Sequence, residues 1–141
     1  MPYTYSVKFY TLTGKQKRVT RPYRYNIDWN GKSRSIIQEM VKEFLKEFWW
    51  HDIVFEEFPV AGSRMTVDFY NDTTRVAVEV QGRQHDEYVK FFHRNKLEFL
   101  KQKKRDADKR EYCKINNIKL VEVRGEDKLS REIFKKYGVN L

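Results

Sequence analysis

Hydrophobic residues recur along this chain with two different periods, and each period predicts a different kind of element. Residues 3–10 alternate between apolar and polar side chains, which indicates a half-buried strand. A turn at residues 13–15 leads into a second extended stretch, which Pro22 restricts to a sheet edge or an arm. Residues 33–50 place their apolar side chains on one broad stripe with helical spacing, so we expect a helix there.

The rest of the chain predicts further strands and helices. A strand is expected at residues 53–60, and a β-hairpin follows at 64–85. A long helix at about 96–116 leads to a strand at 118–124 whose weak alternation indicates burial, and a last helix covers roughly 128–137. The order β-β-α-β-β-β-α-β-α predicts an α/β fold in which a mixed central β-sheet is flanked by helices.

The predicted hairpin carries polar side chains where strands usually carry apolar ones. Its sequence, RMTVDFYNDTTRVAVEVQGRQH, has turn-forming residues between two apolar runs. If residues 72–73 form the tip, Asp68 lies opposite Ala77. Because strand side chains alternate, Glu79 and Gln81 then point to the same sheet face as Asp68. The pairing gathers two carboxylates and an amide at one place.

Two carboxylates that meet across a hairpin repel each other unless a positive charge lies between them. Asp68 and Glu79 could be ordinary solvent-facing acids, but strand interiors disfavour acidic residues. Carboxylate oxygens are the ligands that hard divalent cations prefer. We therefore favour a metal site at Asp68 and Glu79, with the amide of Gln81 beside it.

Charge is distributed unevenly along the chain. The 141 residues suit one domain with a real core, and the formal charge of +9 arises from 29 Lys and Arg against 20 Asp and Glu. Residues 90–110 contain nine basic residues against three acids, and residues 1–31 contain six against one. Two separate basic elements suggest a polyanionic partner. We expect residues 1–31 to form a β-structured basic arm and residues 32–141 to form the core, together one compact unit.

Cysteine content and hydropathy exclude several classes of protein. Cys113 is the only cysteine, so an intramolecular disulfide and a cysteine-based zinc site are excluded, and we expect a small core residue there. No apolar run reaches membrane length, and the N-terminus lacks the apolar region of a signal peptide. We expect a cytoplasmic protein with no membrane partner.

The motifs around the hairpin occur in an order that resembles a known superfamily. They are VDFY at 67–70, VEVQG at 78–82 followed by His85, RDADKREYC at 105–113 and IKLVEV at 118–123. This order is similar to that of the PD-(D/E)XK nucleases, in particular their very-short-patch-repair-like branch, over about residues 35–123. Phage and bacterial homing endonucleases of this branch carry the signature Glu, Asp, x, His, Asp. The resemblance implies a restriction-endonuclease-like core.

The resemblance also implies roles for individual residues. Asp68 would bridge a metal ion and the scissile phosphate, and Glu79 would complete the metal shell, with Mg²⁺ as the ion and Mn²⁺ as a substitute. Gln81 stands where the superfamily usually has lysine, and an amide can orient water but supplies no charge. His85 matches the branch's Gly-x-x-His pattern and could supply that charge or act as general acid or base.

The last acid of the signature has two interpretations. Asp106 matches the branch's Asp-x-x-Lys together with Lys109. Asp106 could equally lie on a solvated helix face and pair with Arg110 at i,i+4.

The first-helix acid of the signature has several candidates. Ser35 and Gln38 match a capping box, and aligning them with the branch's Ser-x-x-Glu puts Gln38 at the acidic position. Glu39 is adjacent and Glu43 lies about one turn further on, and all three could simply form the polar face of a helix. We take Glu39 as the catalytic candidate.

Basic side chains outside the strands predict how a duplex would be held. Arg64 corresponds to an arginine common before the branch's Asp-Phe pair and would contact phosphate or brace the hairpin. The other candidates for backbone contacts lie in the N-terminal arm and the long helix: Lys15, Lys17, Arg18, Arg21, Arg24, Lys101, Lys103, Lys104 and Arg105. Tyr10, Tyr23 and Tyr25 could stack on bases or belong to the core.

Together these features predict a metal-dependent endonuclease that hydrolyses phosphodiester bonds of double-stranded DNA. We expect a site-specific homing-type enzyme, acting in a bacterial host cell if it is phage-encoded. The alternatives are a repair or recombination nickase on the same fold, and a DNA-binding module that has lost catalysis, which Gln81 and the unassigned helix acid keep open. One site per chain nicks one strand, so a double-strand break would need a homodimer on DNA or two sequential events.

Overall fold

The structure is a computed structural model that describes residues 6–81 and 96–141. The chain begins with the strands β1 (Ser6–Tyr10) and β2 (Gln16–Thr20) and the 3-10 helix η1 (Pro22–Tyr25). Helix α1 (Ile36–Trp49) is followed by the strands β3 (Val54–Pro59), β4 (Thr66–Asn71) and β5 (Val76–Gln81). The second described stretch contains α3 (Lys96–Ile115), β6 (Lys119–Arg124) and α4 (Arg131–Lys135).

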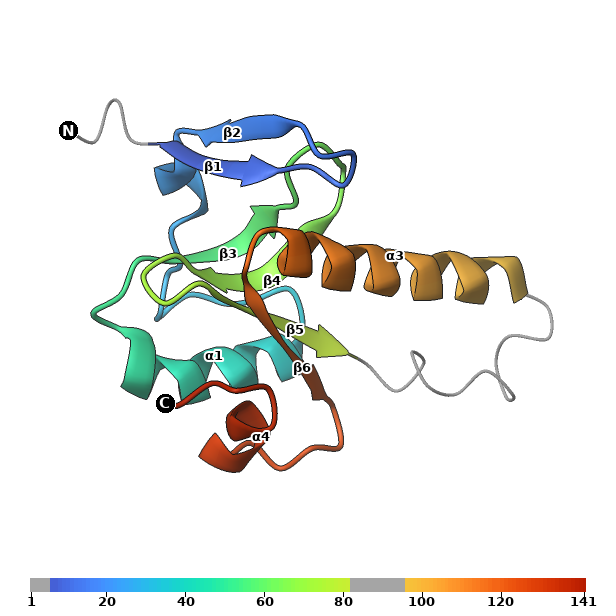
Figure 1. Cartoon of the computed structure of the whole chain (residues 1–141). Coiled ribbons are helices and arrows are strands. Elements are labelled where there is room, and N and C mark those ends of the chain that lie inside the picture. The colour runs from blue at the N-terminus through green and yellow to red at the C-terminus, as the bar shows by residue number, and fades with distance from the viewer. Residues whose placement is uncertain (1–5, 82–95) are drawn as a thin grey trace.

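The main sheet has four strands in the order β3-β4-β5-β6, while β1 and β2 form a separate antiparallel pair (Figure 1). β4 pairs antiparallel with both β3 and β5, and β5 pairs parallel with β6. The sheet is therefore mixed, as predicted. The carboxylate-bearing hairpin β4–β5 occupies its centre.

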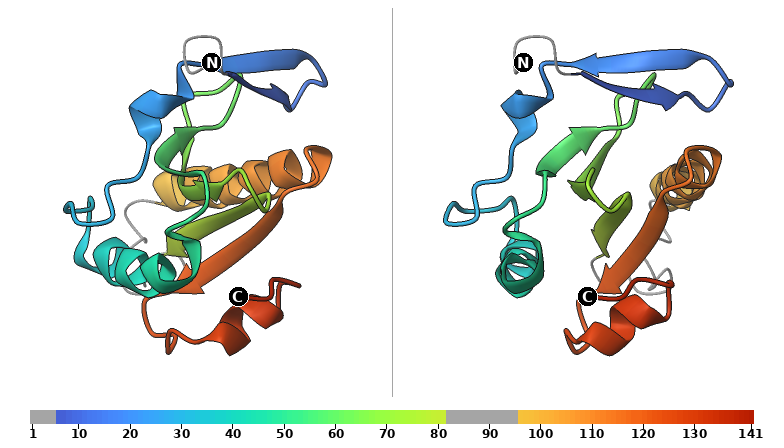
Figure 2. Two further views of the ribbon diagram at one scale, coloured as in Figure 1. Left: turned by 90° about the vertical axis from the view of Figure 1, so that its left-hand side faces the viewer. Right: turned by 60° about the vertical axis from the view of Figure 1, so that its left-hand side comes forward.

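Helices and the N-terminal hairpin cover the two faces of this sheet (Figure 2). One cluster of buried residues, which includes Leu45 and Phe134, joins the sheet to α1 and α4. The other, which includes Phe9, Tyr70 and Cys113, joins it to the β1–β2 hairpin and α3. Cys113 is thus a core residue on α3, as expected.

The apolar stripe of α1 is buried only in part. Ser35 caps the helix as predicted, since its hydroxyl accepts a hydrogen bond of 3.1 Å from the Gln38 N–H. Ile36 and Met40 are exposed, however, whereas Gln38 and Lys42 are buried. The predicted helix is confirmed, but the inward face of its first half meets acidic side chains of β3 and is polar.

The hairpin register also differs from the predicted one. Phe69 pairs with Val78, so the next pair in register sets Asp68 opposite Glu79 rather than Ala77. The shift arises because four residues, instead of two, connect β4 to β5. A shift of two residues leaves each side chain on its predicted face and brings the two carboxylates directly together.

The C-terminal elements agree with the predictions in kind but not in detail. β6 is an edge strand of the described sheet, and the predicted burial holds for Val121 and Val123 but not for Lys119, which is exposed. α4 is shorter than the predicted 128–137, because the preceding residues form a turn in which the Asp127 carboxylate accepts the Arg124 N–H at 2.9 Å.

Candidate active site

The carboxylates of Asp68 and Glu79, here called the carboxylate pair, meet between the two central strands. The two residues are 7 % and 8 % exposed. Glu79 Oε2 accepts the Asp68 N–H at 2.8 Å, and Asp68 Oδ2 accepts the Val80 N–H at 2.7 Å. The second oxygen of each carboxylate is directed to a basic side chain: Glu79 Oε1 accepts from Lys109, and Asp68 Oδ1 lies 3.8 Å from Arg34. A backbone N–H group of the strands therefore holds one oxygen of each carboxylate, and a basic side chain faces the other.

Burial and neighbouring negative charge raise the pKa of Asp68 to about 8. Desolvation is the largest cause, and the carboxylates of Glu79 and Glu57 add to it, while the Val80 N–H and Lys109 act in the opposite direction. A carboxyl group in this environment is stabilised by a proton or by a cation beside it. In the structure, the basic side chains of Lys109 and Arg34 lie beside the pair.

Helix α3 supplies a second layer of charged groups over this face of the sheet. Asp106, Lys109 and Arg110 are spaced so that they share one side of the helix. Arg110 donates two hydrogen bonds to Glu122 of β6, at 2.9 and 2.7 Å, and Gln81 Nε2 donates to the same carboxylate at 2.6 Å. Glu122 chiefly, and Asp106 to a smaller extent, raise the pKa of Arg110. Asp106 acts on Arg110, as one of the two sequence interpretations expected. It is buried, however, and therefore does not lie on a solvated helix face.

Two acids of β3 that sequence reasoning missed extend the cluster. Glu57 lies across from Asp68 in the strand register and has a positive φ of 52°, a strained backbone for a side chain of this kind. Arg34 lies 3.4 Å from Glu57, so its guanidinium spans Glu57 and Asp68. Gln38 Nε2 donates to Glu56 at 2.9 Å and to Glu57 at 3.0 Å. Two adjacent acids inside the apolar segment VFEEFP were the signal that could have indicated them.

A buried lysine supports this edge of the site. Lys42 is 1 % exposed, and its ammonium donates to the carbonyl oxygens of Asp28 and Gly31 at 3.0 and 3.1 Å and pairs with Glu56 at 2.9 Å. These contacts fix α1 to β3 and to the loop before α1. An open cleft of about 500 Å³ lies beside them, with Arg24, Lys32, Arg34 and Glu57 among its lining residues.

One predicted catalytic residue, Glu39, lies outside the cluster. Glu39 accepts the Ser33 N–H at 3.1 Å, so it caps the start of α1, and Gln38 takes the inward position instead. The structure therefore differs from the choice of Glu39 over Gln38, because the helix face that carries Gln38 is the one turned toward the acids of β3. Glu43 is exposed. His85 lies outside the described residues.

The basic side chains predicted to contact DNA lie on the surface. All ten are exposed: Lys15, Lys17, Arg18, Arg21, Arg24, Arg64, Lys101, Lys103, Lys104 and Arg105. The predicted N-terminal arm is a hairpin docked on the core, since Val7, Phe9 and Val19 are buried on its other side. On α3, Lys101 and Lys104 form ion pairs with Glu98 at 3.5 Å and Asp108 at 3.1 Å along the helix.

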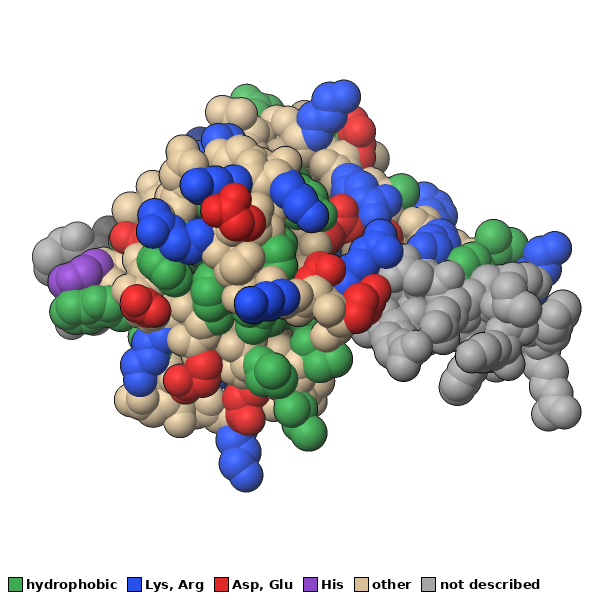
Figure 3. Space-filling model, turned by 90° about the horizontal axis from the view of Figure 1, so that it is seen from below, with side chains coloured by type: hydrophobic (Ala, Val, Ile, Leu, Met, Phe, Trp, Pro, Cys, Tyr) green, Lys and Arg blue, Asp and Glu red, His purple; other side chains and the backbone are tan. Residues whose placement is uncertain are grey.

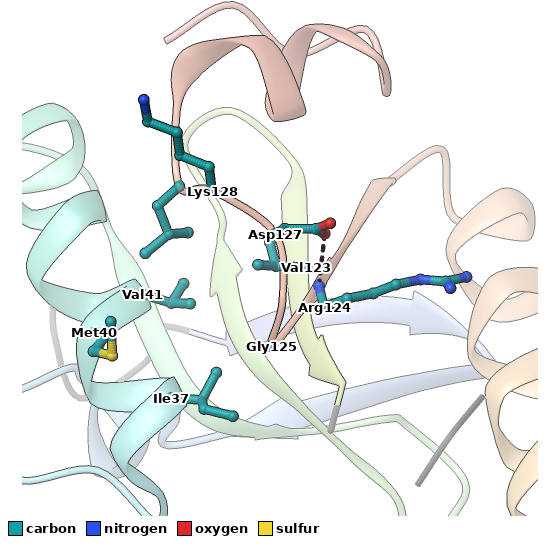
Figure 4. Close-up of a pocket in the computed structure, with 9 residues that line it drawn as sticks. Ile37, Met40, Val41, Val123, Arg124, Gly125, Asp127 and Lys128 are labelled. Atoms are coloured by element: carbon teal, nitrogen blue, oxygen red, sulfur yellow. Dashed lines mark hydrogen bonds between the residues drawn. The ribbon is translucent and has the colours of Figure 1, made fainter. Parts of the chain in front are cut away.

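A separate apolar pocket of about 250 Å³ lies between α1 and the segment that follows β6 (Figure 4). Ile37, Met40, Val41 and Val123 contribute apolar side chains to it. Figure 3 views the side of the molecule that carries α1 and α4, where acidic and basic side chains alternate around apolar patches. This pocket is built on the sheet face opposite α3, away from the carboxylate pair.

The donor set of the site is oxygen-rich. Within residues 6–81 and 96–141, no group of three or more His, Cys, Asp and Glu side chains has the geometry of a metal site. The residues that could hold an ion are Asp68 and Glu79, with the Gln81 amide beside them. No helix in the described part of the chain is long and apolar enough to cross a membrane.

Comparison with known proteins identifies similar viral sequences. No protein-family model and no solved structure matches the chain. The chain is 40 % identical over 72 residues to uncharacterized protein 033L of Invertebrate iridescent virus 3, covering 51 % of the chain and 37 % of that protein. It is 42 % identical over 66 residues to uncharacterized protein 094L of Frog virus 3, covering 46 % of the chain and 43 % of that protein. It is 39 % identical over 59 residues to uncharacterized protein 307L of Invertebrate iridescent virus 6, covering 42 % of the chain and 30 % of that protein. The matched segments span less than half the length of each relative.

Proposed function

We propose that the protein is a metal-dependent DNA endonuclease with a restriction-endonuclease-like core, in which Asp68 and Glu79 hold Mg²⁺ or Mn²⁺. The carboxylate pair carries this proposal. Its two acids lie opposite each other on the central strands, are buried, and direct one oxygen each to a basic group. Such buried hard-oxygen donors suit a small divalent cation.

Hydrolysis of a phosphodiester joins a water oxygen to phosphorus and breaks one phosphorus–oxygen ester bond. Water loses a proton in this step, and the leaving oxygen gains one. A bound Mg²⁺ would polarise the phosphate and lower the pKa of a coordinated water. Asp68 and Glu79 are held in place by strand N–H groups, and Gln81 would orient water through its amide oxygen, because its nitrogen is bound to Glu122. His85 remains the proposed general acid or base.

The basic surface would bind the backbone of the duplex. Arg24 and Arg34 line the same cleft as Glu57, and Arg34 also faces Asp68, so this cleft offers a basic path toward the carboxylate pair. The exposed basic residues of the hairpin and of α3 would extend the contact. The specific form we propose is a site-specific homing-type enzyme acting in the cytoplasm, with a homodimer on DNA where both strands are cut.

The second candidate is a DNA-binding module without catalysis. The neutral Gln81 favours it, as does the way that the chain's own Lys109 and Arg34 already neutralise the carboxylate pair.

Supercoiled plasmid incubated with Mg²⁺ separates the two candidates. The wild-type protein should nick or cut the plasmid, and Asp68→Ala should reduce the rate by about a hundredfold or more. Glu43→Ala, which changes an exposed acid of α1, is the matched control and should retain the wild-type rate. Equal DNA binding by the wild type and Asp68→Ala without cleavage by either, with Mg²⁺ or Mn²⁺, would establish the inactive module instead.

A further inference from the structure

The Gln81 side chain directs its amide nitrogen away from the carboxylate pair. Its Nε2 donates to Glu122 of β6 at 2.6 Å, and Arg110 grips the same carboxylate through two hydrogen bonds. Because β6 and β4 flank β5 on opposite sides, this bond turns the amide nitrogen away from Asp68. Gln81 therefore brings no positive charge to the site.

Lys109 brings a positive charge to the carboxylate pair from α3, the helix that lies over this face of the sheet. Its ammonium donates a hydrogen bond to Glu79 Oε1, and the two side chains are only 17 % and 10 % exposed. Salt and water screen a charge pair of this kind much less than a pair at the surface. The lysine is anchored on α3, whose neighbouring residues Tyr112 and Cys113 are part of the core. Its position is thus defined by the fold.

Two other basic side chains near the pair are engaged differently. Arg110 uses both Nε and Nη2 on Glu122, so its charge is committed to a structural contact. Arg34 has a side chain that is 71 % exposed, and it lies 3.8 Å from Asp68. Of these three cations, Lys109 combines shielding from solvent with direct contact to the pair. An ammonium has three N–H donors, and the contact with Glu79 uses one of them.

We propose that Lys109 is a catalytic residue of the endonuclease, whose ammonium stabilises the negative charge that develops on the scissile phosphate. The inference rests on the proposed function. As the water oxygen bonds to phosphorus and the ester bond breaks, negative charge grows on the phosphate and leaving oxygens, and a fixed cation in a shielded site lowers the energy of that state. The ammonium keeps its protons throughout. The proton released by the attacking water passes to a base, and the leaving oxygen takes up a proton from solvent.

The test replaces Lys109 in the full chain and measures three quantities. Cleavage of supercoiled plasmid at saturating Mg²⁺ gives kcat, calorimetric titration of the DNA-free protein gives Mg²⁺ affinity, and circular dichroism confirms folding. Lys109→Gln removes the charge, and Lys109→Met keeps the apolar stem and serves if the glutamine variant is unfolded. Lys109→Arg restores a cation of different shape. Lys114→Gln changes an exposed lysine of the same helix and is the matched control.

We expect Lys109→Gln to lower kcat by about a hundredfold or more without weakening Mg²⁺ binding, since removal of one transition-state donor has effects of this size. Lys109→Arg should lie between the glutamine variant and the wild type. The inference is wrong if Lys109→Gln cleaves as fast as Lys114→Gln. It is also wrong if Mg²⁺ above the concentration that saturates the wild type restores the full rate of Lys109→Gln, because Lys109 would then act only on metal binding. A wild-type protein that cleaves nothing would instead overturn the proposed function itself.

Discussion

At Asp68, a single side chain links proton binding to the stability of the fold. Burial, with the nearby Glu79 carboxylate, raises the pKa of Asp68 from 3.8 to about 8. Between these two values the folded protein retains a proton that the unfolded chain releases. The number of protons bound is then larger in the folded state, so the free energy of unfolding falls as pH rises through this interval. The stability contributed by protonated Asp68 is complete below about pH 4 and lost above about pH 8.

Replacing Asp68 by Asn should remove this pH dependence, because an amide of the same shape does not ionise. Urea unfolding without divalent ions, measured from pH 4 to 9, should show the wild type losing stability relative to Asp68→Asn across the interval. The difference between the two proteins should level off at either end. Glu43→Gln, at an exposed acid of α1, should leave the wild-type profile unchanged. Parallel profiles for the wild type and Asp68→Asn would show that Asp68 ionises normally in the folded protein.

At the scale of elements, sequence periodicity predicted the helices and strands whose formation depends on neighbouring residues in the chain. The helical stripe and the Ser35 cap located α1, and the alternation around VEVQ located β5 and the face that carries Glu79. The hairpin register was missed because it depends on the length of the turn, which several turn-forming residues leave undetermined. The burial of Lys42 was missed because it depends on Glu56 arriving from another element, a contact that hydropathy does not contain.

The candidate site was predictable to a similar extent. Asp68, Glu79 and Gln81 follow from strand alternation, and Lys109 belongs to the Asp-x-x-Lys motif. Its contact with Glu79 could not be derived, because the position of α3 over the sheet is a tertiary property.

The basic part of α3 should bind the phosphate backbone without regard to base sequence. Charge reversal of Lys101, Lys103, Lys104 and Arg105 to Glu should therefore weaken binding to unrelated duplexes equally. The dependence of affinity on salt concentration should also become less steep, because fewer counterions are released when fewer phosphates are neutralised. Fluorescence anisotropy at several salt concentrations measures both effects.

Lys114→Glu provides the control for this prediction, since it places the same charge change near the other end of α3. A fourfold variant that binds DNA as tightly as Lys114→Glu would show that this part of α3 faces solvent in the complex.

At the scale of the whole molecule, the N-terminal hairpin and the main sheet share one core. The ring of Phe9 contacts those of Phe58, Tyr70 and Tyr112, with centroid distances of 6.0, 5.7 and 6.0 Å. These three aromatic residues belong to β3, β4 and α3. The basic residues on the outer side of the hairpin are therefore held in a fixed position relative to the carboxylate pair, and ordering them on DNA would cost little conformational entropy.

This shared core can be tested with one pair of neighbouring substitutions. Phe9→Ala should lower the free energy of unfolding by about 3–5 kcal/mol, because it removes a buried ring and leaves a cavity between the hairpin and the sheet. Tyr10→Ala changes the adjacent residue, which is 45 % exposed, and should cost much less. Urea unfolding of the full chain, followed by circular dichroism, gives both values. If the two substitutions have the same small effect, the hairpin is an arm that separates from the core, and the fixed placement of its basic residues fails with it.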